Sequence, residues 1–252
     1  MINLNDARAK RSAWIVFDRM LKRFEPFIYR RSRAYVYRQY ERASKVVEIG
    51  LPDNYLDITI DKEYNYFKNL LVTFYRRVVT AFATMLMNQA KDDLGTRSIF
   101  WDHVNRWIND NVGKKVTRVN NTTKDRIKRI IRVGIEEGLS NKEIAYRLTL
   151  IGKIDSIKRA NRIARTETHQ TANKGTFEMA KELNMQVKEW LAARDERTRL
   201  PHRHASGQVV GIDDSFVVGG ENLMFPGDPD GSAENVINCR CTHVFRSKKK
   251  GE

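Results

Sequence analysis

The hydrophobic pattern of the chain changes near Asn184, and this change constrains the fold more than any other feature. Before it, apolar residues recur at helical spacing, as Trp14, Phe17 and Leu21 do in the first run. After it, short alternating segments are separated by Gly, Pro, Asp and Asn, which is typical of strands joined by loops. We therefore predict an α+β protein, with a mainly helical N-terminal region followed by a small loop-rich α+β domain of short antiparallel strands.

Glycine, proline and capping residues divide the first part of the chain into separate predicted helices. Pro26 suits the first turn of a helix, and Gly113 and Gly152 are expected to end helices. Ser140 and Glu143 have the spacing of a capping box, in which each side chain bonds the backbone amide of the other residue. The predicted helices cover residues 6–24, 26–47, 61–94, 98–113, 122–138, 140–152 and 155–183.

The region after Asn184 contains four predicted strands, at residues 186–191, 208–212, 215–218 and 239–245. The 252 residues have room for one large or two small domains. We predict a basic helical region at residues 1–120 and a second domain at 121–252, which contains a helical hairpin, a long helix and the strands.

Positive charge is concentrated in the first part of the chain. The formal net charge is +15, and residues 1–150 hold 29 basic and 17 acidic side chains. Basic helices with interleaved tyrosines suit contact with a phosphate backbone regardless of base sequence, or with an acidic protein surface. A solvated helix face would show a similar pattern. The candidate contact residues are Arg30, Arg31, Arg33, Arg38, Lys114, Lys115, Lys128 and Arg129.

Several protein classes are disfavoured by what the sequence contains. Charged residues precede any long apolar run at the N-terminus, which argues against a secretory signal. The most apolar stretch, residues 70–87, contains Arg76 and Arg77, so we predict no membrane partner. Two cysteines cannot build a disulfide framework and fit a reducing cytoplasm. The sequence contains no phosphate-binding glycine loop and no nucleophile elbow.

Two polar segments are candidates for chemistry. Glu167, in Arg165-Thr166-Glu167-Thr168, could act as a general base, although a helical Glu beside Arg is more typical of a structural ion pair. Asp195, Arg197, Arg199 and His202 follow a predicted strand. They could bind phosphate, hold a nuclease metal together with Glu167, or tether a long loop, and we favour the tether.

Histidines and cysteines cluster in the same domain, at His202, His204, Cys239, Cys241 and His243. Cys and His ligate zinc in closed tetrahedral sites, and a small loop-rich domain gains stability from such a site. On a strand, the spacing of Cys239 and Cys241 would point both side chains to one face. The alternative is that both cysteines are simply small buried residues.

Residues 138–148 have the pattern that begins a helix-turn-helix DNA reader, a glycine turn followed by a capped helix. The segment from Ser156 could supply the recognition helix. However, that helix is expected to continue past Thr168, which is longer than a recognition helix needs to be. We therefore interpret the pattern as a helical hairpin and keep sequence-specific DNA binding as an alternative.

Taken in order, the motifs of residues 127–245 resemble the phage Mu protein F-like minor head proteins, a head-morphogenesis family of tailed bacteriophages. The resemblance gives structural roles to Thr166, Glu167, Trp190, Asp195, Arg197, Arg199 and Asn238. The family pattern also matches the candidate zinc ligands His202, Cys239 and Cys241, whereas His204 and His243 lie outside it.

The resemblance also implies a function. It implies a structural protein that is not an enzyme and that aids head assembly, DNA packaging or genome delivery. The expected partners are the portal protein, the major capsid protein and packaged double-stranded DNA. The expected location is the virion, in the head interior or at the portal vertex, in several copies, with the host cytoplasm as the site of assembly.

Overall fold

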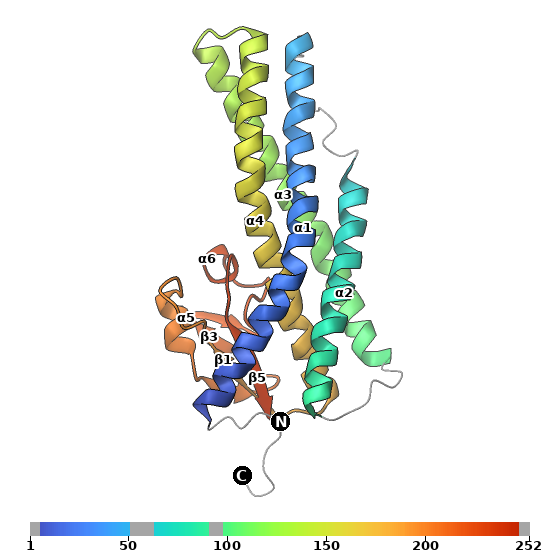
Figure 1. Cartoon of the computed structure of the whole chain (residues 1–252), viewed down its shortest axis with the longest axis vertical. Helices are drawn as coiled ribbons and strands as arrows, with labels where there is room; N and C mark the ends of the chain where they lie inside the picture. The colour runs from blue at the N-terminus through green and yellow to red at the C-terminus, as the bar shows by residue number, and fades with distance from the viewer. Residues whose placement is uncertain (1–5, 51–62, 91–97, 247–252) are drawn as a thin grey trace, which may run out of the picture. The chain divides into compact units, whose positions relative to one another are not determined.

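A computed structural model describes residues 6–50, 63–90 and 98–246 of the chain. Four long helices come first: α1 (Ala7–Ile49), α2 (Tyr64–Ala90), α3 (Ser98–Glu136) and α4 (Asn141–Glu182). Short strands and two short helices follow (Figure 1). The prediction of an α+β protein with a helical N-terminal region is confirmed. Asp61 and Gly95, the predicted ends of the helix at residues 61–94, lie outside the described residues.

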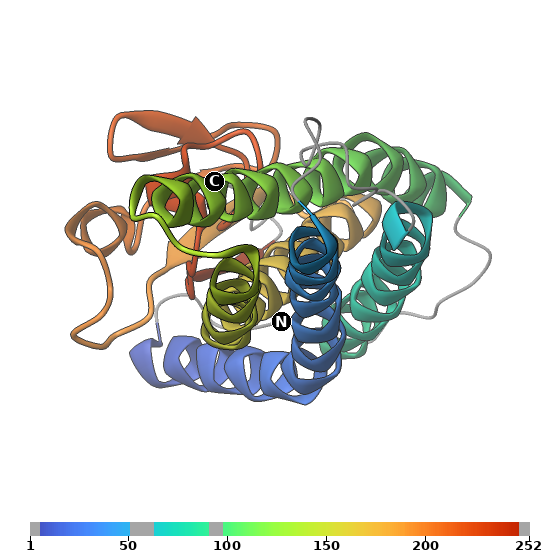
Figure 2. The same ribbon diagram turned by 90° about the horizontal axis from the view of Figure 1, so that it is seen from above.

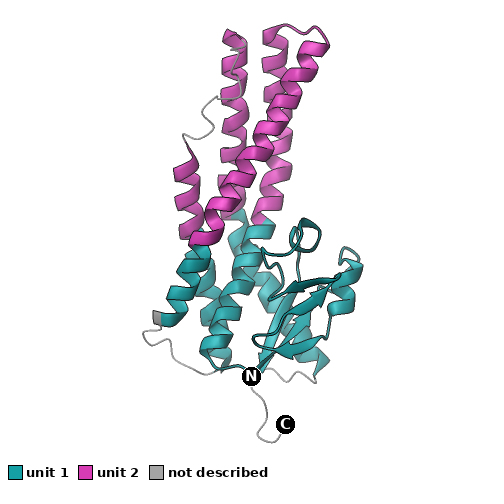
Figure 3. Ribbon diagram, turned by 180° about the vertical axis from the view of Figure 1, so that it is seen from behind, with its two compact units in different colours: residues 1–26, 74–108, 165–252 teal, residues 27–73, 109–164 magenta. Residues whose placement is uncertain are grey.

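The chain forms two compact units (Figure 3). Unit 1 contains residues 1–26, 74–108 and 165–252, and unit 2 contains residues 27–73 and 109–164. Each of the four long helices therefore contributes a segment to both units. The predicted division into residues 1–120 and 121–252 stays a prediction. It rests on charge and on the family resemblance, whereas the two units are defined by contacts between residues.

Unit 2 is built on an apolar core between three helices. In Figure 2 the unit 2 segments of α1, α3 and α4 stand beside one another. Glycine lets two pairs of these helices approach closely, since a Cβ at Gly152 would lie 2.6 Å from Tyr40 Cβ and one at Gly134 would lie 2.7 Å from Ile144 Cγ1. The core residues are Val36, Tyr40, Ala43 and Val47 of α1, Ile127 and Ile131 of α3, and Ile144, Ala145 and Leu148 of α4.

Three predicted helix boundaries are wrong, because α1, α3 and α4 run through Pro26, Gly113 and Gly152 without a break. Packing overrides the local preference of glycine here. Gly152 lies against Tyr40, and the carbonyl of Gly113 accepts a hydrogen bond of 3.4 Å from the Tyr64 hydroxyl. The boundary between the two units falls at Pro26 within α1.

The turn between α3 and α4 was predicted correctly. Gly138 has φ +71° and follows the end of α3, where left-handed backbone favours glycine. The Ser140 amide donates to the Glu143 carboxylate at 2.8 Å, and the Glu143 amide donates to the Ser140 hydroxyl at 3.4 Å. Because α4 then continues to Glu182, residues 138–183 form no separate recognition helix, and the helix-turn-helix alternative loses its structural basis.

The strands of unit 1 form two small antiparallel sheets. β1 (Val187–Leu191) lies between β2 (Val209–Gly211) and β5 (Thr242–Arg246). Trp190 of β1 pairs with His243 of β5. A separate hairpin joins β3 (Phe216–Val218) to β4 (Glu221–Leu223). The short helices α5 (Leu200–Ala205) and α6 (Ala233–Val236) lie in the connections and, like β4, were not predicted.

The fourth predicted strand begins later than expected, at Thr242 instead of residue 239. Cys239 and Cys241 therefore lie in the loop before β5, and the argument that they share a strand face is wrong. Both are nevertheless buried in one cluster with Trp190. The rest of this cluster is Ala192, Ala205, Phe216, Val218 and Leu223.

By length and composition α2 is apolar enough to cross a membrane, with a mean hydropathy of 1.4 over its most apolar window. Half of that window is buried inside the protein. Phe67 and Leu71 are buried in unit 2, and Val78 and Phe82 are buried in unit 1. The apolar character of α2 is thus used in packing, as in the core helix of a globular protein.

Candidate metal centre

Three segments of unit 1 bring His202, Cys239 and Cys241 together. β1 ends at Leu191, and α5, with Pro201 in its first turn, places His202 beside the Trp190 ring at a centroid distance of 5.7 Å. The loop after α6 carries the two cysteines. All three side chains are buried.

The three ligand atoms are spaced as a metal requires. His202 Nδ1 lies 3.3 Å from Cys241 Sγ and 3.6 Å from Cys239 Sγ. Two ligands of a tetrahedral zinc with bonds of about 2.0 Å to nitrogen and about 2.3 Å to sulfur are about 3.5 Å apart. The three ligand atoms all lie within 4.8 Å of one another, and these residues are the group found with such spacing in the described part of the chain.

The tautomer of His202 is set by a neighbouring amide. Asn235 Nδ2 donates to the Val218 carbonyl at 3.2 Å, so Asn235 Oδ1 faces His202 Nε2 at 3.3 Å as an acceptor. Nε2 therefore carries the proton, and Nδ1 presents its lone pair to the sulfurs. Metal-bound histidines are oriented in this way by a partner on the second ring nitrogen.

The two thiols differ in their protonation. Hydrogen bonding from Cys239 lowers the pKa of Cys241 to about 5. Burial raises the pKa of Cys239 well above its usual range. The pair thus shares one negative charge at neutral pH, and a metal would replace the remaining proton. The donor set fits a soft or borderline metal such as zinc.

Around the centre, charged side chains fasten the loops. Asp195 forms a two-fold ion pair with Arg240, the residue between the cysteines. Hydrogen bonding from Arg240 lowers the pKa of Asp195 to about 2. Arg199 Nη2 donates to the Ile237 carbonyl. Arg197 is the exposed member, with 3.7 Å between Arg197 Nη2 and Asp195 Oδ2. These contacts support the interpretation of the segment as a loop tether.

Helix α4 is tied to the same loop. Thr166 Oγ1 accepts a hydrogen bond of 3.1 Å from the Asn238 amide. Asn238 has φ +55°, which turns the chain into the cysteine loop. Glu167 is buried and accepts a hydrogen bond from the Tyr75 hydroxyl. The structural role of this segment is thereby supported over that of a solvent-facing base.

The nuclease alternative required Glu167, Asp195 and His202 on one metal. The structure places Glu167 against Tyr75, Asp195 against Arg240 and His202 against the cysteines. Neither carboxylate belongs to the metal-binding group found among the described residues. His204 is exposed on α5.

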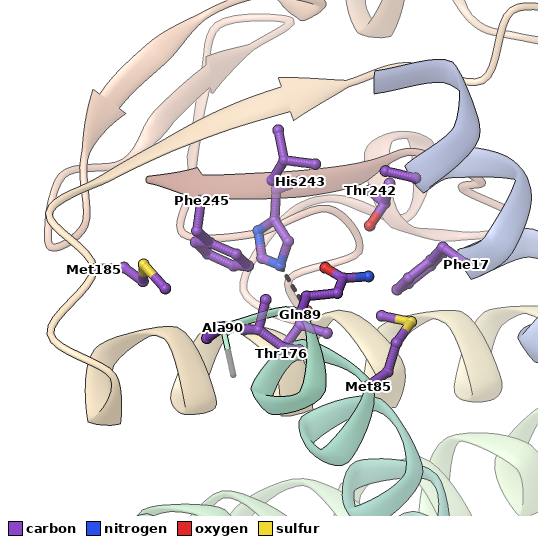
Figure 4. Close-up of a pocket in the computed structure, with 12 residues that line it drawn as sticks. Phe17, Met85, Gln89, Ala90, Thr176, Met185, Thr242, His243 and Phe245 are labelled. Carbon is purple, nitrogen blue, oxygen red and sulfur yellow. Dashed lines mark hydrogen bonds between the residues drawn. The ribbon is translucent and has the colours of Figure 1, made fainter. Parts of the chain in front are cut away.

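His243 points into a separate cavity of unit 1 (Figure 4). Its Nε2 lies 3.0 Å from Thr176 Oγ1, and Phe17, Met85 and Phe245 also line the space. Burial holds the pKa of His243 well below its usual range, so the ring is neutral. The cavity has a volume of about 40 Å³, which holds a few water molecules and is far below the roughly 300 Å³ of a ligand site. We interpret it as a packing cavity.

A larger groove of about 260 Å³ lies beside Asp195, between the start of α1 and the end of β1. Trp14 lines it and donates to the Arg240 carbonyl at 3.0 Å. Lys10 lines it and pairs with Glu189 at 2.6 Å. Asp195 and Lys10 are engaged in ion pairs, and Trp14 is engaged in a hydrogen bond. None of these three side chains is therefore free to react with a molecule in the groove.

The predicted basic contact residues all fall in unit 2. Arg30, Arg31, Arg33 and Arg38 lie on α1, and Lys114, Lys115, Lys128 and Arg129 lie on α3. Unit 2 contains 22 basic and 12 acidic side chains, a net charge of +10 out of +15 for the whole chain. Positive charge is therefore concentrated in unit 2.

Sequence reasoning missed three residues at the centre. Asn235 and Arg240 complete the hydrogen bonds around His202 and Asp195. The position of Arg240 between two cysteines was a usable signal, whereas nothing in the sequence marks Asn235. Lys188 is fully buried and donates to the Met224 carbonyl at 2.8 Å, with its Nζ 4.6 Å from the centre of the Phe177 ring.

The stretch of chain that contains the candidate centre is similar to a known protein family. Residues 125–244 match the model of the family "Phage Mu protein F like protein". The matched stretch, somewhat less than half of the chain, is similar to this family. It contains the whole candidate centre together with the tethers around it.

Curated relatives share parts of the chain. An NAD(+)–arginine ADP-ribosyltransferase, EFV, of Enterococcus faecalis is 38% identical over 118 residues, which are 45% of this chain and 24% of that protein. The minor head protein GP7 of Bacillus phage SPP1 is 33% identical over 121 residues, 46% of this chain and 38% of that protein. YqbB of Bacillus subtilis, an uncharacterized protein, is 25% identical over 180 residues, 69% of this chain and 58% of that protein.

The chain thus spans between about a quarter and somewhat more than half of the length of these relatives. No solved structure gives a significant match to it.

Proposed function

We propose that this chain is a minor head protein of a tailed bacteriophage, a structural component that aids head assembly, DNA packaging or genome delivery. The observation that carries the proposal is the phage Mu protein F-like match over residues 125–244, together with the similarity to the minor head protein of phage SPP1. The mutually bonded side chains of the candidate centre support a scaffold role, because they hold loops together and the three side chains that could bind a metal are buried.

The test is to look for the protein in virions. Particles made from the genome that encodes this chain are purified and analysed by mass spectrometry. We expect the protein in DNA-filled heads, in a few copies each. Deleting the gene should lower the yield of infectious particles at least tenfold. Absence from purified heads, with normal particle yield after the deletion, would refute the proposal.

The partners follow from location and charge. We propose that the chain sits in the head interior or at the portal vertex and contacts the portal protein, the major capsid protein or both. The net charge of +10 on unit 2 supports an additional, sequence-independent contact with packaged DNA. Co-expression with the portal and with the capsid protein, followed by size-exclusion chromatography, separates the two protein partners.

The metal at the centre is proposed to be structural zinc, held by His202, Cys239 and Cys241. The support is the spacing of the three ligand atoms, the tautomer set by Asn235 and complete burial. Metal analysis of the purified protein should give about one zinc per chain. A zinc content near zero in protein purified without chelator would remove this part of the proposal.

We further propose that the chain does not catalyse a reaction, although one relative is named as an ADP-ribosyltransferase. The matched stretch is 24% of that protein, and the candidate acids of this chain are held in internal bonds. Plasmid DNA incubated with the protein and magnesium or manganese should stay intact. NAD+ incubated with the protein should release no nicotinamide. Cleavage that is abolished by Asp195→Ala would support the nuclease alternative instead.

A further inference from the structure

A row of exposed apolar side chains runs along the unit 2 segment of α4. Tyr146, Leu150, Ile154 and Ile157 have relative exposures of 66%, 42%, 57% and 38%. They follow one another at intervals of 4, 4 and 3 residues. At about 100° and about 1.5 Å per residue, they occupy an arc of about 80° and a length of about 16 Å. We refer to these four residues as the α4 stripe.

The other face of the same helix segment already has its partners. Ile144, Ala145 and Leu148 are packed in the core of unit 2, and Gly152 lies against Tyr40. The α4 stripe is therefore a second apolar face, additional to the one that folds the unit. Exposed apolar residues scattered singly need no explanation, but a continuous row on one helix marks a contact surface.

Basic residues border the α4 stripe. Lys153 lies about 20° beyond Tyr146 on one side of the stripe, and Lys158 lies about 40° beyond Ile154 on the other. Between residues 144 and 164 the remaining exposed or half-buried charges are Arg147 and Arg162. Asp155, the acidic residue of this stretch, is buried and accepts a hydrogen bond of 2.8 Å from the Tyr40 hydroxyl.

We propose that the α4 stripe docks an amphipathic helix of another protein, with a row of apolar side chains and acidic residues on both edges. A straight row at helical spacing packs against a second helix by ridges and grooves, and carboxylates would face Lys153 and Lys158 across the contact. A second copy of this chain is the poorer occupant, because Glu143, the exposed acidic residue one turn before the stripe, is already bonded to Ser140. Nucleic acid offers no apolar face for Leu150 and Ile154. The inference does not depend on the assignment as a minor head protein.

The test uses the full-length protein and two designed, fluorescently labelled helical peptides. Both peptides carry the same leucine row, with glutamate at the edges in one and lysine in the other. Fluorescence anisotropy should show that the glutamate peptide binds at least about tenfold more tightly than the lysine peptide, and that its binding weakens with salt. Equal binding of the two peptides, or no binding of the glutamate peptide, would overturn the proposal.

Variants then locate the contact. Leu150→Gln with Ile154→Gln should weaken binding of the glutamate peptide at least about tenfold. The matched control is Ile99→Gln on α3, an isoleucine with 62% exposure outside the stripe. Lys153→Glu with Lys158→Glu should reverse the preference toward the lysine peptide. If the stripe variants bind like the control, or the charge reversal leaves the preference unchanged, the site is wrong.

Two further measurements separate other occupants. In a sedimentation assay with phosphatidylglycerol vesicles, the wild type and the Leu150→Gln, Ile154→Gln variant should bind the vesicles equally. Analytical ultracentrifugation should show no self-association that the same variants abolish. A positive result in either experiment would replace the helix with a membrane surface or with a second copy, and would overturn the proposal.

Discussion

The core of unit 2 and the loop-rich region of unit 1 after β1 are held together by different forces. In unit 2, apolar residues from three helices interdigitate, and glycine allows close helix approach at Gly134 and Gly152. In residues 187–246 the strands are three to five residues long, and much of the binding between segments comes from polar side chains. His202, Asp195 and Arg199 each bond a segment far away in the sequence.

The difference shows what a short-stranded fold requires. Long helices satisfy their own backbone and gain stability from a regular apolar face. Loops leave many backbone groups to be satisfied and bury less apolar surface for each residue. Specific hydrogen bonds, ion pairs and a metal can supply the missing connections. The two regions should therefore respond differently to substitution.

The largest expected effect is at the proposed metal ligands. Cys239→Ser with Cys241→Ser should lower the melting temperature by about 10 °C or more, because loss of a structural metal removes several kcal/mol of folding free energy. Differential scanning calorimetry of the protein with and without a chelator measures this. His204→Ser serves as the control. His204 is an exposed histidine on the same helix as His202, and the variant should melt like the wild type. Equal melting of all three proteins would contradict the comparison.

A close helix contact in unit 2 gives the next effect. Gly152→Ala places a Cβ 2.6 Å from Tyr40 Cβ, so α1 and α4 must separate locally at a cost of about 2 kcal/mol. Urea denaturation followed by circular dichroism measures this loss. Gly50→Ala is the control, because nothing lies within 4 Å of the added atom. If Gly152→Ala were as stable as Gly50→Ala, the tight packing of the two helices would be wrong.

The buried lysine of β1 should give unit 1 a distinctive pH dependence. Burial lowers the pKa of Lys188 to about 8, from an ordinary value of 10.5. Between these two pH values the unfolded chain binds more protons, so the free energy of unfolding should rise with pH, by an amount on the order of 2 kcal/mol. Lys188→Met should remove this rise, whereas Lys142→Met, at an exposed position, should keep it. Identical pH profiles for the wild type and Lys188→Met would contradict the burial of this ammonium.

The smallest expected effect separates the two units by charge. Arg30→Gln, Arg31→Gln and Arg33→Gln together should weaken non-specific DNA binding about tenfold and reduce its salt dependence. The control triple, Arg11→Gln, Arg19→Gln and Arg23→Gln, changes the same number of charges on the unit 1 segment of α1. Filter binding at several salt concentrations measures both. Equal losses would show that the charge of unit 2 has no special role.

The helical part of the fold could be predicted where the signal was local. The capping box at Ser140 and the turn at Gly138 were predicted because adjacent residues determine them. The break at Gly152 was wrong because this glycine packs against Tyr40, which is distant in the sequence. A glycine that admits a neighbouring helix looks in the sequence like a glycine that ends its own.

The candidate centre was predicted in its residues but not in its geometry. The residue types and the family resemblance pointed to His202, Cys239 and Cys241, and the structure brings these three together. Their placement in loops before β5 was missed, because strand length depends on pairing with β1 and not on the alternation of residues 239–245. Asn235, whose role is to orient one ring, leaves no signal in composition or spacing.

The central claim is that His202, Cys239 and Cys241 form a closed structural centre that fastens the loop-rich region. The most direct measurement is the zinc content of the full-length protein, wild type against Cys239→Ser with Cys241→Ser, by plasma mass spectrometry. We predict about one zinc per wild-type chain and almost none in the variant. A wild-type protein without zinc, whose melting temperature is unchanged by added zinc or chelator, would contradict it.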